Sequence, residues 1–100
     1  MDRDSIGIAA ITSWEIALLV ARRRIKIDEP IIEWWHDVIA VPSTTLFPLT
    51  IEVAAIAATL PDPIRDPADR LIVATAVYHR LPLVTKDGRI RASGLVPTIW

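Results

Sequence analysis

Short apolar runs alternate along this chain with longer segments whose apolar positions repeat at helical spacing. The run Ser5 to Ile11 carries isoleucine at alternate positions between turn-prone residues, a pattern typical of a buried strand. Further strands are predicted at Thr44 to Phe47, Leu83 to Thr85 and Leu95 to Trp100. Helices are predicted directly after Ile11 and over Pro30 to Ala40, Ile51 to Leu60 and Pro67 to Arg80, with a short helical segment over Arg89 to Ala92.

The start of the first helix has several candidate capping residues. Thr12 or Ser13 is expected to cap it, and Glu15 stands where it would complete a capping box with Thr12. The following residues leave almost no polar face. We therefore expect this helix to be mostly buried.

Two later helices have plainer start signals. Thr50 is expected to cap the helix that begins at Ile51, and Asp66 the helix in which Pro67 is the first residue. Because strands and helices alternate, the chain is predicted to be an α/β layer with a mostly parallel sheet covered by helices. Its 100 residues suit one packed domain, without internal repeats.

The amino-acid composition excludes several kinds of functional site. The chain has no cysteine and two histidines, which excludes disulfides, thiolate metal sites, cysteine nucleophiles and a three-histidine zinc site. The formal net charge is -1, whereas a protein that coats nucleic acid is expected to be strongly basic. The apolar runs are shorter than the roughly 18 to 20 residues of a membrane span, and the first residues lack a secretory signal, so a cytoplasmic protein is expected.

Three acidic residues are predicted to lie at the carboxyl edge of the sheet, where open parallel sheets bind ligands. Glu15 lies near the start of the first helix, Asp69 in the first turn of a later helix, and Asp87 directly after the strand that ends at Thr85. Converging carboxylates favour a cation between them, and an oxygen-only site suits Mg²⁺ or Mn²⁺. Such an ion would activate water against a phosphodiester. Each acid also has a purely structural explanation, as a cap, a helix-dipole partner or a turn residue.

Four segments resemble one family of proteins. They are Ile8 to Leu19 (IAAITSWEIALL), Asp66 to Ala76 (DPADRLIVATA), Leu83 to Asp87 (LVTKD) and Val96 to Trp100 (VPTIW). In this order and separation they are similar to the PIN domains of VapC-type toxins. The resemblance extends over nearly the whole chain, from Ser5 to Trp100.

The resemblance implies a Mg²⁺- or Mn²⁺-dependent endoribonuclease with a PIN-like α/β/α fold of three layers. It implies that Glu15, Asp69 and Asp87 are the catalytic metal ligands. The Thr85 hydroxyl would orient one of these ligands or a metal-bound water without binding the ion itself. It also implies an RNA substrate, a cognate antitoxin protein and a homodimer, and the 52% apolar content is consistent with association.

Basic side chains next to Asp87 are candidates for RNA binding. Lys86, Arg89 and Arg91 adjoin the predicted site and would engage the phosphate backbone. A second basic run, Arg22 to Lys26, is better explained as a solvated helix end.

One part of the family pattern is missing. The family opens with a central strand whose final Asp is the first metal ligand, and that strand lies between those predicted here at Ser5 to Ile11 and Leu83 to Thr85. Three explanations are open: an internal start within a longer toxin, a degraded remnant, or direct pairing of the two flanking strands. The alternative function is therefore an inactive PIN remnant that binds an antitoxin or a PIN partner.

Overall fold

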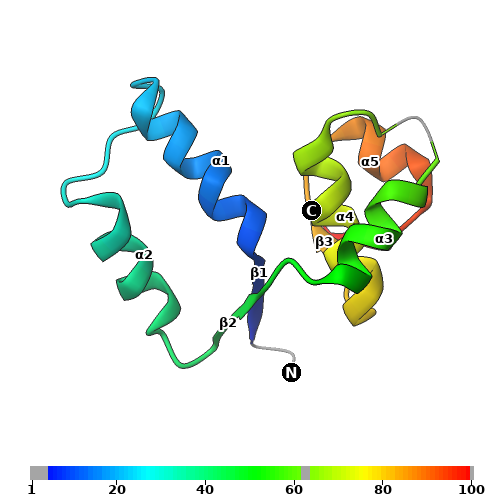
Figure 1. Ribbon diagram of the computed structural model, residues 1–100, viewed down its shortest axis with the longest axis horizontal. Helices are drawn as coiled ribbons and strands as arrows, with labels where there is room; N and C mark the ends of the chain where they lie inside the picture. Colours follow the sequence, from blue (N-terminus) through cyan, green and yellow to red (C-terminus); the bar gives the residue numbers. More distant parts are fainter. Residues whose placement is uncertain (1–4, 62–63, 100) are drawn as a thin grey trace. The chain divides into compact units, whose positions relative to one another are not determined.

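The computed structural model describes residues 5–61 and 64–99 and divides the chain into two units, one ending at Pro48 and the other beginning at Leu49. The predicted role of Trp100 in the last strand falls outside the described residues. The first unit contains β1 (Ile6–Ala9), α1 (Ala10–Ala21), α2 (Ile31–Ile39) and β2 (Thr44–Phe47). The second contains α3 (Ile51–Thr59), α4 (Pro67–His79), β3 (Leu83–Val84), α5 (Gly88–Ser93) and β4 (Thr98–Ile99) (Figure 1).

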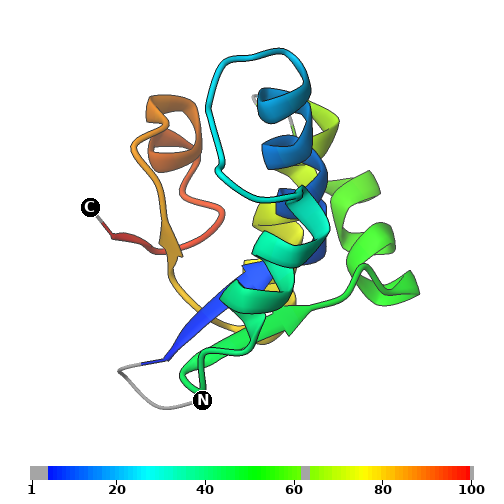
Figure 2. The ribbon, with the colours of Figure 1, turned by 90° about the vertical axis from the view of Figure 1, so that its left-hand side faces the viewer.

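Strands β1 and β2 form a parallel pair in the first unit, visible in blue and green in Figure 2. Ile6 lies opposite Thr44, and Ala9 opposite Phe47. Gly7 lies directly under the Phe47 ring, and a Cβ atom at this position would collide with the ring edge. A larger residue would force the Phe47 ring to move, so glycine suits the close approach of the aromatic side chain to the backbone.

The boundary between β1 and α1 differs from the prediction. The strand stops at Ala9, and Ala10 and Ile11 already belong to the helix. Ala9 is the N-cap and offers no side-chain hydrogen bond, so the capping box between Thr12 and Glu15 is wrong. An apolar run that passes from strand to helix without a break gives no signal for the boundary, because both structures bury such residues.

The prediction that α1 is mostly buried is also wrong. No residue of α1 is buried, and the Trp14 side chain is 55% exposed. In fact no residue in the described part of the first unit is buried. One further helix and two four-residue strands provide too little surface to cover a helix that is apolar on all sides.

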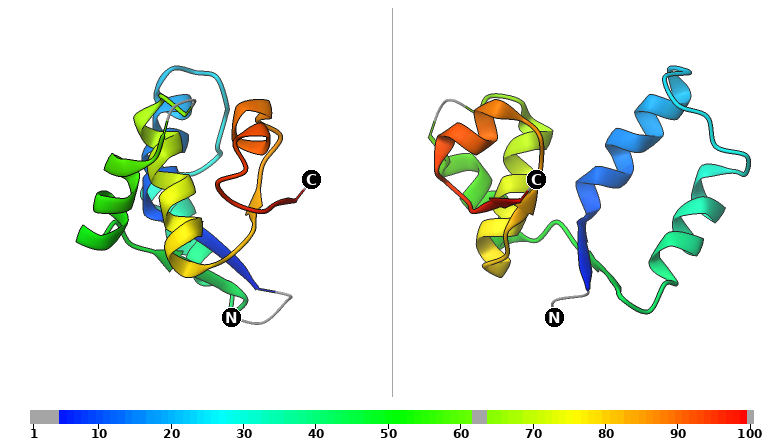
Figure 3. Two further views of the ribbon diagram at one scale, coloured as in Figure 1. Left: turned by 90° about the vertical axis from the view of Figure 1, so that its right-hand side faces the viewer. Right: turned by 180° about the vertical axis from the view of Figure 1, so that it is seen from behind.

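The hydrophobic core lies in the second unit. Helix α3 packs against α4, where Val53 and Ala57 contact Ala74 (Figure 3, left). A second cluster lies between α4, α5 and the segment before β4; its buried members are Ile64, Val73, Ala76, Ile90 and Val96. Small residues on α3 and α4 let the two helices approach closely.

The predicted caps of this unit are confirmed. The Thr50 hydroxyl accepts a hydrogen bond from the Val53 N–H at 3.2 Å, and α4 begins at Pro67 with Asp66 as its N-cap. Helix α4 ends at Arg80, which adopts the left-handed conformation with φ 55° and ψ 45°. Local sequence signals thus place these helices within one residue of their observed ends.

Strands β3 and β4 form a second parallel pair, shorter than predicted. The ladder extends one hydrogen bond beyond each end, because the Leu83 N–H donates to the Pro97 carbonyl and the Thr85 N–H to the Ile99 carbonyl. Each described strand pairs with a strand of its own unit. Helices alternating with parallel strands confirm the predicted α/β class.

Candidate functional site

Asp69 lies in the first turn of α4, as the sequence predicts. Its side chain is half-buried, and no hydrogen-bond donor in the described part of the chain contacts its carboxylate. Buried or half-buried carboxylates usually accept hydrogen bonds, since removing the charge from water is otherwise unfavourable. The Asp69 carboxylate is therefore available for a ligand.

Asp66 lies next to Asp69 and has a confirmed capping role. One of its carboxylate oxygens accepts the Asp69 N–H at 3.0 Å. Carboxylate oxygens of the two residues approach within 4.8 Å of each other. The cap occupies Oδ1 of Asp66 and leaves Oδ2 without a capping hydrogen bond. Asp66 therefore adds a negative charge beside Asp69. The sequence predicts Asp66 only as a helix cap, a role that does not include this charge.

Asp87 is the N-cap of α5. Its Oδ1 accepts the N–H of Arg89 at 2.8 Å and that of Ile90 at 3.2 Å, so the turn role of Asp87 is also satisfied. Oδ2 takes no part in the cap and is on an exposed side chain. The Thr85 hydroxyl accepts the Asp87 N–H at 3.0 Å, which fixes the backbone at the point where Asp87 leaves β3.

Asp66, Asp69 and Asp87 are close enough to interact electrostatically and are together called the acidic group. Burial raises the pKa of the Asp69 carboxyl above its usual value, and the negative charges of Asp66 and Asp87 raise it further, whereas Arg89 opposes the shift. A raised pKa means that the folded chain disfavours the ionised form of Asp69. A cation would relieve this repulsion, and carboxylate oxygens are the donors that hard divalent ions prefer. The residues present therefore fit a Mg²⁺ or Mn²⁺ ion.

The other predicted site residues occupy the following places. Lys86, Arg89 and Arg91 are exposed on either side of the start of α5, and Arg89 is close enough to act on Asp69. Glu15 is half-buried beyond the first turn of α1, in the other unit. Because α1 begins at Ala10, Glu15 does not form the predicted capping box. Its role as a metal ligand stays a prediction.

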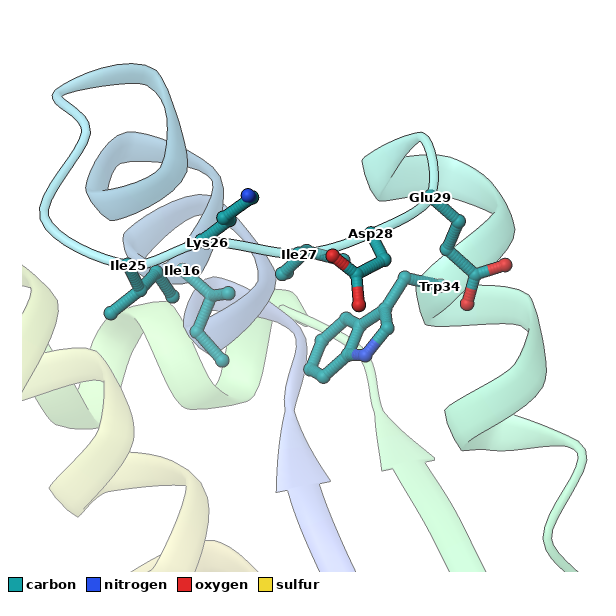
Figure 4. A pocket seen from close by; sticks show the side chains of 7 residues that line it. All are labelled: Ile16, Ile25, Lys26, Ile27, Asp28, Glu29 and Trp34. Atoms are coloured by element: carbon teal, nitrogen blue, oxygen red, sulfur yellow. The ribbon is translucent and has the colours of Figure 1, made fainter.

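A cavity of about 540 Å³ lies in the first unit between α1, α2 and their connecting loop (Figure 4). Ile16, Ile27 and Trp34 line it together with acidic side chains from the loop. Glu29 at its rim has a raised pKa, caused by burial and then by a side-chain hydrogen bond to Asp37 and nearby negative charge. None of the predicted site residues lines this cavity.

Sequence reasoning missed one residue, Arg70. Its guanidinium donates to three backbone carbonyls, of Ala57, Leu60 and Ile64, on both sides of the loop between α3 and α4. A signal was present in the sequence, because Pro61 and Pro63 bring no N–H groups to this loop and its carbonyls need a donor from elsewhere.

Comparison with known proteins identifies similar chains. The PIN domain family matches residues 1–94. Ribonuclease VapC22 of Mycobacterium tuberculosis is 41% identical over 90 residues, which cover 89% of this chain and 68% of that protein. No solved structure matches the chain significantly. Among the helices in the described part of the chain, none has the length and apolar character to cross a bilayer.

Proposed function

Because the chain belongs to the PIN domain family, as a member of its VapC type, we propose that it is an endoribonuclease that requires a divalent metal ion. The observation that carries the proposal is the acidic group of the second unit. Asp69 has no hydrogen-bond donor to its carboxylate among the described residues, and its pKa is raised by burial and then by the charges of Asp66 and Asp87. A bound cation would reduce the repulsion between these neighbouring carboxylates, and such clusters of perturbed carboxylates are typical of functional sites.

Asp69 and Asp87 would hold the ion, Mg²⁺ or Mn²⁺. The Asp69 carboxylate takes no part in the cap of α4, and the cap of α5 leaves Oδ2 of Asp87 open. Glu15 is the third proposed ligand, on the basis of its position in the matched sequence. A divalent ion at such a site supplies a Lewis acid that polarises a phosphoryl oxygen and lowers the pKa of water. Thr85 holds the Asp87 backbone in place through the hydrogen bond to its N–H.

The neighbouring cations bind the substrate in this proposal. Lys86, Arg89 and Arg91 are exposed beside Asp87 and would contact RNA phosphates flanking the cleaved bond. Their positive charges concentrate the polyanion near a site whose own carboxylates would repel it. With an RNA substrate, the proposed location is the cytoplasm.

An antitoxin protein and a second copy of the chain are the proposed partners, and the two units together are proposed to form one PIN domain, as the span of the family match supports. The exposed apolar surface of α1, with Trp14 at 55% exposure, favours a second candidate function. In that alternative the chain has no turnover and acts by binding an antitoxin or a PIN partner.

Cleavage of a labelled RNA pool with Mn²⁺ tests the proposal. The full chain should cleave with Mn²⁺ and stop when the metal is chelated. Asp87→Asn should abolish cleavage and leave the melting temperature nearly unchanged, because the amide oxygen can still accept the N–H groups of the cap. Absence of cleavage by the wild type, or equal cleavage by Asp87→Asn, would favour the binding function.

A further inference from the structure

The Arg70 side chain connects the end of α3 to the start of α4. Its Nε donates to the Ala57 carbonyl at 2.9 Å, Nη1 donates to the Ile64 carbonyl at 2.6 Å, and Nη2 donates to the Leu60 carbonyl. Three different nitrogens of one planar group thus bind three carbonyls. Lysine has one nitrogen and a different geometry, so it would not reproduce this arrangement.

The three carbonyls need this donor because the local backbone offers few others. Ala57 lies in the last turn of α3 and Leu60 is its C-cap, so their carbonyls lack partners from the helix. The last turn of α3 contains no basic residue. Arg70 therefore caps α3 from the neighbouring helix.

Arg70 is also tied to the acidic group. Its backbone N–H donates to the Asp66 carbonyl at 3.0 Å, and the Asp66 carboxylate accepts the N–H of Asp69. Ile64, which Arg70 holds through its side chain, lies two residues before Asp66. The guanidinium thereby fixes the backbone from which Asp66 and Asp69 project.

We propose that Arg70 is a positioning residue of the metal site, which sets the spacing of the Asp66 and Asp69 carboxylates by fixing the backbone at Ile64, two residues before the N-cap of α4. The inference rests on the proposed function, because it presumes that the Asp69 carboxylate binds a metal ion and that Asp66 holds its charge beside it. Arg89, by contrast, acts on Asp69 through its charge. Arg70 acts through the geometry of its planar guanidinium. A lysine at this position keeps the positive charge but not this geometry, so it would not preserve the role.

Mn²⁺ affinity of the full chain tests the role of Arg70 directly. Titration followed by the electron paramagnetic resonance signal of free Mn²⁺ gives a Kd independent of RNA cleavage. Arg70→Lys should raise this Kd by about tenfold or more, as for other residues that orient metal ligands. Thr50→Ala is the matched control, since it removes a hydrogen bond from the far end of α3 and leaves α4 untouched. It should lower the melting temperature and leave the Kd unchanged.

A second measurement on the wild type covers the case in which Arg70→Lys fails to fold. If Arg70 positions the ligands, metal binding must stabilise its hydrogen bonds in return, because coupling between two sites is reciprocal. Hydrogen exchange of the Arg70 Nε–H, followed by NMR, should slow when Mg²⁺ is added. An unchanged exchange rate, an unchanged Kd in Arg70→Lys, or an equal rise in Thr50→Ala would each contradict the positioning role. Failure of the wild type to bind Mn²⁺ would instead contradict the proposed function, and the role of Arg70 with it.

Discussion

The Asp66 carboxylate acts on Asp69 in two opposite ways. It accepts the Asp69 N–H at 3.0 Å and so stabilises the first turn of α4, while its charge raises the pKa of the Asp69 carboxyl. The hydrogen bond favours the helix, and the repulsion disfavours the ionised side chain on the same residue. The start of α4 therefore combines a well-formed cap with an unfavourable charge.

Asp69→Asn should stabilise the metal-free protein at neutral pH. The folded-state pKa of Asp69 is raised above its unfolded value, so its contribution to stability is fully present at acid pH and is lost as pH rises through the folded pKa. Removing the charge removes that loss. We expect the melting temperature in EDTA at pH 7 to rise, by less than about 4 °C because Asp69 is partly exposed.

The matched control is Glu52→Gln, which removes a charge from the first turn of α3. A carboxylate there interacts favourably with the helix dipole, so this variant should be neutral or slightly less stable. Asp69→Asn should in addition lose the rise in melting temperature that Mn²⁺ gives the wild type. A lower stability of Asp69→Asn at pH 7, or a retained metal response, would contradict the assignment.

Thr85→Val should impair the site through Asp87. Valine has nearly the same shape as threonine but no oxygen to accept the Asp87 N–H. We expect RNA cleavage to fall by about tenfold or more and stability to fall by about 1 kcal/mol. Thr85→Ser keeps the acceptor and should keep most of the activity. Equal activities of the valine and serine variants would show that this hydrogen bond has no functional role.

Glu29→Gln should make the first unit less sensitive to pH. The pKa of Glu29 is raised by burial, by a hydrogen bond to Asp37 and by the charges of Asp37 and Glu33, so its favourable contribution is lost as pH rises through the folded pKa. Glutamine can keep the hydrogen bond without the charge. The variant should therefore be more stable than the wild type at pH 7 and show little difference near pH 4.

Trp34 lines the same cavity as Glu29 and is one of the four tryptophans that contribute to the fluorescence of the chain (Figure 4). Thermal unfolding followed by tryptophan fluorescence at the two pH values gives the comparison. Asp28→Asn, at the same cavity, is the control and should change the pH dependence less. An identical pH dependence in wild type and Glu29→Gln would exclude the electrostatic explanation.

Arg80→Gly should stabilise α4. Arg80 closes the helix with φ 55° and ψ 45°, a left-handed conformation in which a side chain is strained and glycine is not. The left-handed conformation costs a residue with a Cβ atom roughly 1–2 kcal/mol, and part of the gain from removing this cost is offset by the greater backbone entropy of glycine in the unfolded chain. Glycine should therefore raise the free energy of unfolding by about 1 kcal/mol or less, measured by urea denaturation. Arg80→Ala keeps the Cβ atom and should not give this gain, so equal stabilities of the two variants would contradict the explanation.

Features set by neighbouring residues could be predicted from the sequence. Thr50 and Asp66 cap their helices as expected, because a cap bonds to an N–H three residues away and the whole interaction is local. The strand at Thr44 to Phe47 and the turn at Asp87 follow from similarly local signals. The same reasoning placed Asp69 in the first turn of its helix, where the structure has it. It placed Asp87 directly after a strand, and the structure adds that Asp87 is the N-cap of α5.

Features that depend on distant contacts could not be predicted in this way. The prolines after α3 indicate that nearby carbonyls need a donor. The contact between Arg70 and Ala57 nevertheless joins residues thirteen apart in sequence, and no local pattern identifies Arg70 as that donor. The exposure of Trp14 depends on how many elements are present to cover α1, which the apolar pattern of the helix does not contain. The charge of Asp66 on Asp69 became apparent only from the geometry of their carboxylates.

The confinement of buried side chains to the second unit has a consequence for how the molecule opens. Every buried residue in the described part of the chain lies between Val53 and Val96, and α4 alone contributes five of them. Amide protons exchange with solvent through local unfolding, and segments with few buried contacts open most readily. Amides of α1 and α2 should therefore exchange with deuterium first, while those of α4 persist until the second unit unfolds as a whole.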